Sequence, residues 1–346
     1  MDAPAAPTLD VVAIGHAIVD VLAHCDDALV AAHGLTKGTM TLVDHDRSEA
    51  VYESMPAGIE VSGGSAANTA AGVASLGGAA AFVGKVRDDA LGEIFTHDLR
   101  STGVVYTTAP GTSGPPTARC LILVTPDAER TMNTYLGVAG ELAATDVDGK
   151  LVASARITYL EGYLVGLPSA EGALALAADA AHRAGRRVAL TLSDPFWVRL
   201  QRDAFKALLP NVDILLGNET EAIELTGEAT VEAALAALHK SWGGSAPPDP
   251  PGARFVVALT RGAAGAIASD GKETVSVPAE PVPAVEDTTG AGDLFAAGFL
   301  LGLARERPLA DCLRLGALAA AEVIGHTGAR PQTSLAALAA ARGLNV

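Results

Sequence analysis

Short runs of β-branched and other apolar residues alternate along this chain with alanine- and leucine-rich segments of helical length. The alternation predicts a doubly wound α/β fold, in which helices cover both faces of a mostly parallel sheet. Candidate strands lie at 10–15, 80–86, 155–162, 187–194, 212–218 and 254–260, and candidate helices at 88–103 and 169–185. With 346 residues, 49% of them apolar, the chain can bury the core of one large α/β domain over 1–346.

Two stretches, 35–62 and 117–136, interrupt this alternation with brief Thr/Val-rich runs. The second turns around "PDAER" in the manner of a hairpin. We expect a small β-sheet apart from the main one, forming a discontinuous lid from about 16–62 and 117–136. The proline-rich segment 245–252 is expected to be a surface loop.

The charge balance excludes some classes of partner. The chain has 24 basic and 40 acidic residues and a formal net charge of -16, which argues against nucleic acid or an anionic membrane as the main partner. Three scattered cysteines provide neither a disulfide framework nor metal-ligand spacing. The acidic start "MDAPAAPTLD" lacks the basic region of a signal peptide, and no apolar run reaches the ~18 residues that span a bilayer. We therefore expect a soluble cytoplasmic protein.

The segment "VEDTTGAGDLFAAGFLLGLA" (285–304) places Gly290, Ala291, Gly292 and Asp293 at the start of an apolar helix. First-turn N–H groups of a helix have no partner within it and favour negative charge. These amides could stabilise a transferring phosphoryl group while Asp293 accepts a proton from an attacking hydroxyl. The alternative is that Asp293 only caps its helix.

Polar residues also follow several predicted strands, where ligands of open parallel sheets bind. In "GNETE", Asn218 and Glu221 could orient water around Mg²⁺ or form a helix capping box, and both interpretations remain open. Thr260 and Gly262 follow another strand.

A further candidate site lies near the N-terminus. Gly63 and Gly64 open a helix from which Asn68 projects, and Asp20 lies in an apolar run four residues after His16. A buried Asp20 needs a partner, which is either a hydroxyl-rich ligand or backbone N–H groups.

Other phosphate-binding motifs are incomplete. Each Gly-Lys pair lacks the Ser or Thr that follows it in a P-loop. "GAGDLF" has Phe295 where a dinucleotide fingerprint needs its third glycine, so an NAD-dependent oxidoreductase is only a distant alternative.

"DTTGAGDLFAAGF" (287–299) and "GGSAANTAAGVASLGG" (63–78) resemble, in the expected order, the two signatures of the PfkB carbohydrate kinase family, the ribokinase-like kinases. The resemblance covers nearly the whole chain and includes "NETE" and "TRGAAG" (260–265). It implies an ATP-dependent, Mg²⁺-requiring kinase that phosphorylates a primary hydroxyl of a sugar or nucleoside, often with a monovalent cation such as K⁺ near "DTTGAGD".

The resemblance also implies roles for individual residues. Asp293 matches the catalytic base, Gly290 to Gly292 the anion hole, and Asn218 with Glu221 the Mg²⁺ and phosphate motif. The expected substrate contacts are His16, Asp20, Gly63, Gly64, Asn68 and Arg130, and the expected ATP contacts are Asn218, Thr260, Gly262, Gly265 and His326.

Within the family, "GHAIVD" and "TARCLILVTPDAERTMNTYLG" most resemble the adenosine-kinase-like branch, and Arg130 lies at the position of its lid arginine. His16 stands where that branch usually has Asn. Adenosine is therefore the leading acceptor. The alternatives are another nucleoside, a sugar such as ribose or fructose, and a nucleoside-binding module without activity. Lid strands of such kinases sometimes pair between subunits, so the chain is expected to be a monomer or homodimer.

Overall fold

The computed structural model describes residues 6–127, 129–242 and 255–344. The predicted loop at 245–252 and the first residue of the predicted strand 254–260 lie outside these ranges.

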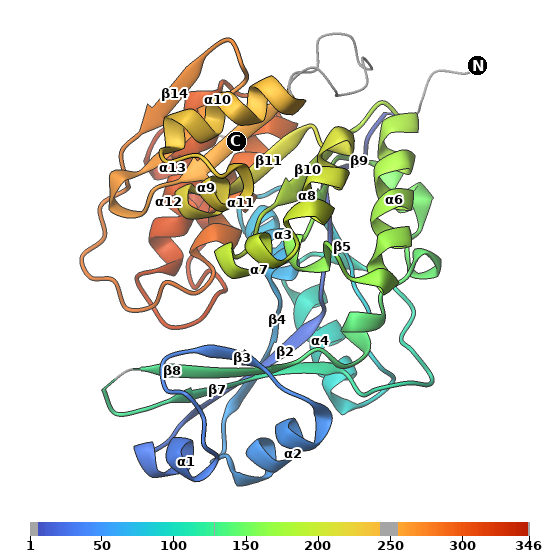
Figure 1. Ribbon diagram of the computed structural model, residues 1–346, viewed down its shortest axis with the longest axis vertical. Helices are drawn as coiled ribbons and strands as arrows, with labels where there is room; N and C mark the ends of the chain where they lie inside the picture. The colour runs from blue at the N-terminus through green and yellow to red at the C-terminus, as the bar shows by residue number, and fades with distance from the viewer. Residues whose placement is uncertain (1–5, 128, 243–254, 345–346) are drawn as a thin grey trace.

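The main sheet has nine described strands, and Figure 1 shows it in the upper part of the molecule. From one edge to the other they are β14 (Thr274–Val277), β13 (Ala266–Ser269), β12 (Val256–Thr260), β11 (Ile214–Asn218), β10 (Arg187–Thr191), β9 (Ala155–Leu160), β1 (Leu9–Ile14), β5 (Ala80–Val83) and β6 (Val105–Tyr106). All neighbours are parallel except the pairs β12–β13 and β13–β14.

Helices cover both faces of this sheet, because strand residues point alternately to two separate apolar clusters. In β1, Val11 and Ala13 join one cluster and Val12 and Ile14 the other. The first cluster includes α3 (Ser65–Ser75), α4 (Ala90–Ser101), α11 (Ala291–Ala304), α12 (Leu309–Val323) and α13 (Leu335–Ala341). The second includes α5 (Gly149–Ala153), α6 (Pro168–Arg183), α7 (Pro195–Leu200), α8 (Arg202–Leu208), α9 (Glu219–Thr226) and α10 (Val231–Trp242). The predicted doubly wound α/β class is confirmed.

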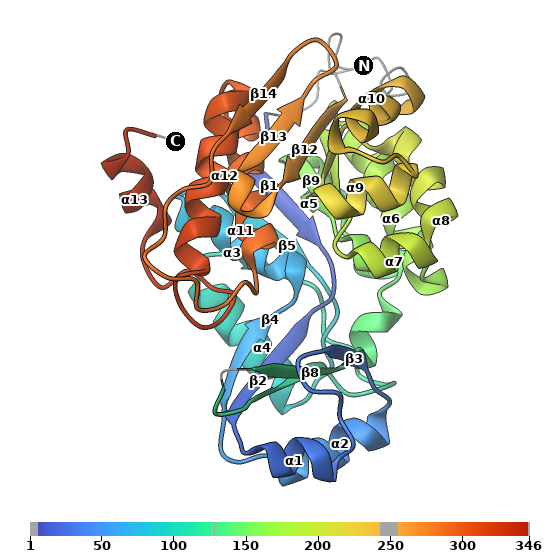
Figure 2. The same ribbon diagram turned by 60° about the vertical axis from the view of Figure 1, so that its left-hand side comes forward.

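The second, smaller sheet is also confirmed. Its order is β3 (Met40–Leu42), β8 (Arg130–Tyr135), β7 (Ala118–Val124), β2 (Ile18–His24) and β4 (Ile59–Gly63). The predicted hairpin is the antiparallel pair β7–β8. Figures 1 and 2 show this sheet below the main one, with α1 (Asp27–Ala32) and α2 (His45–Ser54) on its far side.

The two faces of the small sheet differ in what covers them. Leu121 and Leu123 of β7 join the cluster that contains Val30 of α1 and Val51 of α2. Cys120, Ile122 and Val124, on the opposite face, form a separate apolar cluster with Ile18, Leu22 and Met132. Asp20 is paired in register with Cys120, so it lies on the face that the two helices leave uncovered.

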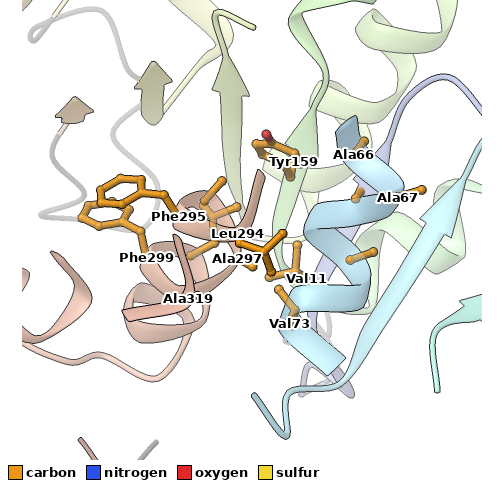
Figure 3. Packing of buried hydrophobic residues seen from close by; sticks show 14 of the residues in the cluster. Val11, Ala66, Ala67, Val73, Tyr159, Leu294, Phe295, Ala297, Phe299 and Ala319 are labelled. Atoms are coloured by element: carbon orange, nitrogen blue, oxygen red, sulfur yellow. The ribbon is translucent and has the colours of Figure 1, made fainter. Parts of the chain in front are cut away.

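Close packing of α3 against α11 fixes the site described below. Figure 3 shows Val73 of α3 on the side that faces Leu294 and Ala297 of α11. A Cβ at Gly72 would lie 2.7 Å from Ala297 Cβ, and one at Gly298 would lie 2.5 Å from the Leu315 backbone. Glycine therefore allows α11 to lie close to both α3 and α12.

Candidate active site

Residues from several elements meet at the carboxyl ends of the central strands. A small polar hollow of about 70 Å³ lies between α11, β11 and the segments that follow β10 and β12. It is lined by Ser65, Thr191, Ser193, Leu216, Gly217, Asn218, Glu221, Thr260, Gly292, Asp293 and Phe295. The fold thus places the predicted base beside the predicted metal and phosphate residues.

Asp293 is held by α3. Its Oδ1 accepts a hydrogen bond from Ser65 Oγ at 2.6 Å, and its Oδ2 accepts one from Asn68 Nδ2 at 2.9 Å. Burial raises the pKa of Asp293 to about 6. The hydrogen bonds from Ser65 and Asn68 lower this pKa, the nearby carboxylate of Glu161 raises it, and the charge of Arg330 lowers it. A carboxylate with this pKa is mostly ionised at neutral pH and can accept a proton. Gly290 is the N-cap residue of α11, and no side chain caps the helix there. The Asp293 carboxylate accepts its hydrogen bonds from α3, so it does not cap its own helix.

The N-terminus of α11 offers fewer free amides than expected. Ala291 N–H donates to Thr288 O at 3.2 Å, so this predicted donor already has a partner. Within the described ranges, no backbone carbonyl accepts the N–H of Gly292 or Asp293. Gly290 has φ +82°, and its Cβ would lie 2.8 Å from Ala329 Cβ, so backbone conformation and packing explain this glycine. A Cβ at Gly292 would meet nothing within 4 Å, and Gly292 lines the hollow.

Asn218 and Glu221 form a capping box, which is one of the two interpretations that the sequence left open. Asn218 Oδ1 accepts the Glu221 N–H at 2.9 Å, and the Glu221 carboxylate accepts the Asn218 N–H at 2.8 Å and its Nδ2 at 2.7 Å. Burial raises the pKa of Glu221 to about 7, the backbone hydrogen bond of Asn218 lowers it, and Asp194 raises it further. The box leaves both side chains on the hollow.

Whether the site can hold Mg²⁺ depends on Asn218 and Glu221. No cluster of three or more His, Cys, Asp or Glu side chains suited to a metal occurs in the described part of the chain. Mg²⁺ typically takes one or two carboxylates and completes its shell with water and phosphate oxygens. One buried carboxylate with an adjacent amide on a polar hollow fits that requirement.

A larger cleft of about 780 Å³ adjoins the hollow and shares Asn218, Thr260, Gly292 and Phe295 with it. Gly262 and Gly265, two of the expected ATP contacts, line this cleft. Gly265 has φ +88°, and a Cβ at this position would clash with Val277 O. Apolar side chains line another part of it, namely Val282, Val285, Ala317, Ala320, Ala321 and Ile324. His326 is not in the lining; its ring lies 3.3 Å from Glu322 Oε2.

Asp20 lies next to Gly63, where a Cβ would clash with its Oδ2. Burial raises the pKa of Asp20 to about 7, with Arg330 and Arg130 lowering it and Asp293 raising it. In the described residues no backbone N–H donates to the carboxylate, which was one of the two partners expected. Asn68 Oδ1 is buried and has no hydrogen-bond partner among the described residues. Two acceptors near the base are therefore left for a ligand.

His16 is 2% exposed, and its Nδ1 lies 2.6 Å from Glu161 Oε1. Glu161 also accepts the N–H of His16 at 3.3 Å and that of Ala66 at 3.0 Å. His16 Nε2 is buried and has no partner among the described residues.

Arg130 connects the small sheet to the loop before α11. Its guanidinium lies 2.6 Å from Asp287 Oδ2, and the two side chains are 14% and 4% exposed. The Asp287 carboxylate also accepts the N–H of Thr289 at 3.0 Å and of Gly328 at 2.9 Å. The backbone of Gly64 has φ +94° and lies close to the backbone oxygen of His16.

Residues of this site that were not singled out from the sequence include Ser65, Glu161, Asp287 and Arg330. Ser65 and Asp287 stand inside the two quoted motifs, so their positions were a usable signal. Glu161 and Arg330 contact residues 145 and 268 positions away, and no local pattern indicates such contacts.

Comparison with known proteins places the chain in context. The model of the pfkB family carbohydrate kinases matches residues 10–335. The structure of a probable sugar kinase protein from Rhizobium etli CFN 42 is 45% identical with a TM-score of 0.87, covering 98% of this chain and 99% of that chain. Adenosine kinase from Sinorhizobium meliloti is 47% identical with a TM-score of 0.86, covering 96% and 99%.

A cytidine kinase from Thermococcus kodakarensis is 40% identical over 130 residues, which are 37% of this chain and 42% of that enzyme. This match therefore spans less than half of the relative's length. Separately, none of the described helices is both long and apolar enough to cross a membrane.

Proposed function

This chain belongs to the pfkB family of carbohydrate kinases, and we propose that it phosphorylates the 5′-hydroxyl of a nucleoside, with adenosine as the preferred acceptor. The family assignment makes it a phosphotransferase with an alcohol group as acceptor. Kinases of this family use ATP, generally with Mg²⁺. The dehydrogenase alternative has no support from these comparisons.

The observation that carries the proposal is the position of Asp293. Its carboxylate is at the N-terminus of α11, bonded to Ser65 and Asn68, on a hollow that adjoins a nucleotide-sized cleft. As the general base, Asp293 takes the proton of the acceptor hydroxyl while the oxygen attacks the γ-phosphorus and the bond to the β–γ bridging oxygen breaks, which releases ADP. The N–H groups of Gly292 and Asp293 favour the negative charge on the transferring group.

The acceptor is proposed from the unpartnered groups beside the base. Asp20 and Asn68 Oδ1 can accept hydrogen bonds from two hydroxyls, such as those of a ribose. Because Gly63 and Gly64 carry no side chain, the Asp20 carboxylate and His16 O can lie against the backbone there, and Arg130 borders the same region. Similarity to the Sinorhizobium meliloti adenosine kinase supports adenosine.

The cleft is proposed as the ATP site. The apolar part at Val282, Val285 and Ile324 suits an adenine ring, and Thr260, Gly262 and Gly265 border the end nearer the phosphates. Asn218 and Glu221 would hold Mg²⁺ together with water and phosphate oxygens, and the ion would neutralise phosphate charge. His326 is a less direct candidate, since its ring is outside the lining.

Three further features remain predictions. The small sheet acts as a lid over the acceptor; a monovalent cation such as K⁺ near the 287–293 loop promotes activity; and the protein is a monomer or homodimer. Activity measured with and without K⁺, and the mass in solution from light scattering, test the last two.

The test of the proposal is ADP release with adenosine, cytidine, other nucleosides, ribose and fructose. Adenosine should give the highest kcat/KM, and Asp293→Asn should lower kcat by roughly 10²–10⁴. Asp311→Asn, on the distant helix α12, is the matched control and should keep full activity. Faster turnover of ribose or fructose would favour a sugar kinase, as the similarity to the Rhizobium etli protein suggests. Turnover of no acceptor, or an unaffected Asp293→Asn variant, would refute the proposal.

A further inference from the structure

Arg330 reaches the candidate site from the opposite end of the sequence. It follows α12, and its guanidinium donates to the Ser62 backbone oxygen at 3.0 Å and 3.2 Å, to Ser62 Oγ at 2.9 Å and to the Ala67 backbone oxygen at 2.7 Å. Three nitrogens of one planar group are thus bound to two neighbouring segments. Such an arrangement fixes the distance between those segments.

The two segments are the end of a strand of the small sheet and the first turn of a helix of the main body. Ser62 belongs to β4, Ala67 belongs to α3, and Gly63 and Gly64 lie between them. Gly64 has φ +94°, a conformation that glycine adopts without steric cost. A glycine pair at such a junction is flexible by itself, so Arg330 supplies contacts that hold it in one geometry.

This junction determines where the groups around the acceptor lie. Ser65 and Asn68, in the first turn of α3, both donate to Asp293. Gly63 packs directly against the Asp20 carboxylate. A change in the angle between β4 and α3 would therefore move Asp20 relative to Asp293.

Arg330 also brings positive charge to this junction. Burial lowers the pKa of Arg330 to about 10, which leaves it charged at neutral pH, and Asp98, Asp20 and Asp293 favour the charged form. Asp98 accepts the Ser62 N–H at 2.7 Å. One cation thus interacts with both acids that border the acceptor region.

We propose that Arg330 is a positioning residue that fixes the Gly63–Gly64 junction and keeps Asp20 and Asp293 correctly spaced for the acceptor. The proposal rests on the function proposed above for its kinetic consequences, but its structural part does not. Arg330 need not touch the acceptor or ATP for this role.

The structural part is tested without any substrate, by hydrogen–deuterium exchange of the intact protein. Arg330→Met should speed exchange in 59–68 severalfold and leave β11 unchanged. Arg305→Met is the matched control, because Arg305 donates to Gly77 O at 2.9 Å at the other end of α3. It should leave exchange in 59–68 as in the wild type.

The kinetic part separates charge from geometry. Arg330→Met should raise the KM of the acceptor about tenfold with little change in the KM of ATP, because the ATP cleft does not include this junction. Arg330→Lys keeps the charge but cannot bind all of these oxygens. Arg330→Lys should therefore speed hydrogen–deuterium exchange in 59–68 but keep the acid limb of kcat/KM near that of the wild type.

The acid limb is the readout that a purely structural role would not move. Asp293 interacts with Glu161, Arg330, Ser65 and Asn68, and Asp20 interacts with Arg330, Asp293 and Arg130. Removal of the Arg330 charge should therefore move the acid limb upward by up to about half a pH unit, less than Ser65→Ala does. Unchanged exchange in 59–68, or an unchanged acceptor KM and acid limb in Arg330→Met, would overturn the proposal. A wild type that phosphorylates no acceptor refutes the proposed function only, and the exchange result then decides the role of Arg330.

Discussion

At the scale of single residues, two opposing effects determine the pKa of Asp293: burial raises it, and two hydrogen bonds lower it. Burial raises its pKa to about 6, and the bonds from Ser65 and Asn68 hold it below the value that burial alone would give. A base must be ionised, so activity should fall as the pH falls through about 6. Ser65→Ala removes one bond and should move the acid limb of kcat/KM upward by roughly 0.5–1 pH unit.

The measurement is a kcat/KM profile from acid to alkaline pH. Ser169→Ala is the control, because Ser169 is exposed and its hydroxyl bonds only to Gly140 O among the described residues. Its profile should overlay that of the wild type. A downward shift in Ser65→Ala would show that the hydrogen bond does not stabilise the ionised base.

The His16–Glu161 pair leads to a second prediction. Glu161 is 1% exposed and accepts N–H groups from His16 and Ala66. In Glu161→Gln, only one side-chain oxygen remains to accept these donors, so the unfolding free energy should fall by about 1–3 kcal/mol and the acceptor KM should rise. His16→Asn, which restores the residue usual in the adenosine-kinase-like branch, should keep most of the activity.

Urea unfolding and steady-state kinetics measure these effects. Glu228→Gln is the comparison, because Glu228 is exposed and follows the C-terminal end of α9. It should change neither property appreciably. Wild-type stability and KM in Glu161→Gln would mean that the pair does not organise the site.

At the scale of helices, the approach of α11 to its neighbours controls the geometry of the base. A Cβ at Gly298 would lie 2.5 Å from the backbone of Leu315 in α12. Gly298→Ala should therefore push α11 away, cost roughly 1–3 kcal/mol of stability, and lower kcat by disturbing the bonds of Asp293 with α3. Gly172→Ala, in α6, is the control, because its Cβ would meet Ala144 at an ordinary 3.5 Å.

Thermal unfolding and kcat of the two variants test this packing. Gly172→Ala should be neutral or stabilising by about 0.5–1 kcal/mol, since alanine suits a helix interior better than glycine. Equal effects of the two substitutions would show that α11 can move without consequence for the site.

Strands and the large helices were predictable because their apolar patterns repeat over many residues. The predicted strand 187–194 ends in the structure at Thr191, and Ser193 then adopts φ +71° where the chain turns into the hollow. Helices α1 and α2 were not predicted, although Asp26 and Asp44 cap them. Both are short, and α2 is mostly polar, so their caps were the main signal.

At the scale of the whole molecule, the sequence indicated which residue types serve the site but not how distant segments pair. Asp293 and the Asn218–Glu221 box are local patterns and can be identified from the sequence alone. The ion pair between Arg130 and Asp287 depends on how the small sheet docks against the loop before α11. Such contacts follow from tertiary packing, which no short motif encodes.

The acids collected at the site should also make the ligand-free protein less stable at neutral than at mildly acidic pH. The folded-state pKa of Asp20, at about 7, lies above the ordinary value of 3.8. Between these two pKa values the folded state therefore holds a proton that the unfolded chain releases. The contribution of Asp20 to stability is lost as the pH rises from 3.8 through the folded-state pKa. Glu221 and Asp293, whose pKa values are raised to about 7 and about 6, act in the same direction.

Asp20→Asn isolates this effect. At about pH 7.5 the free energy of unfolding should be higher in this variant than in the wild type. The decrease in the free energy of unfolding between about pH 5.5 and 7.5 should be smaller in the variant by roughly 1–2 kcal/mol. Asp127→Asn is the control, because hydrogen bonds from Lys37 and Thr125 lower the pKa of Asp127 to about 2, so it stays ionised over this range in both states. Urea unfolding at several pH values is the measurement. If Asp20→Asn leaves the slope of stability against pH unchanged, then Asp20 is ionised in the free protein and its charge is already balanced by Arg330 and Arg130.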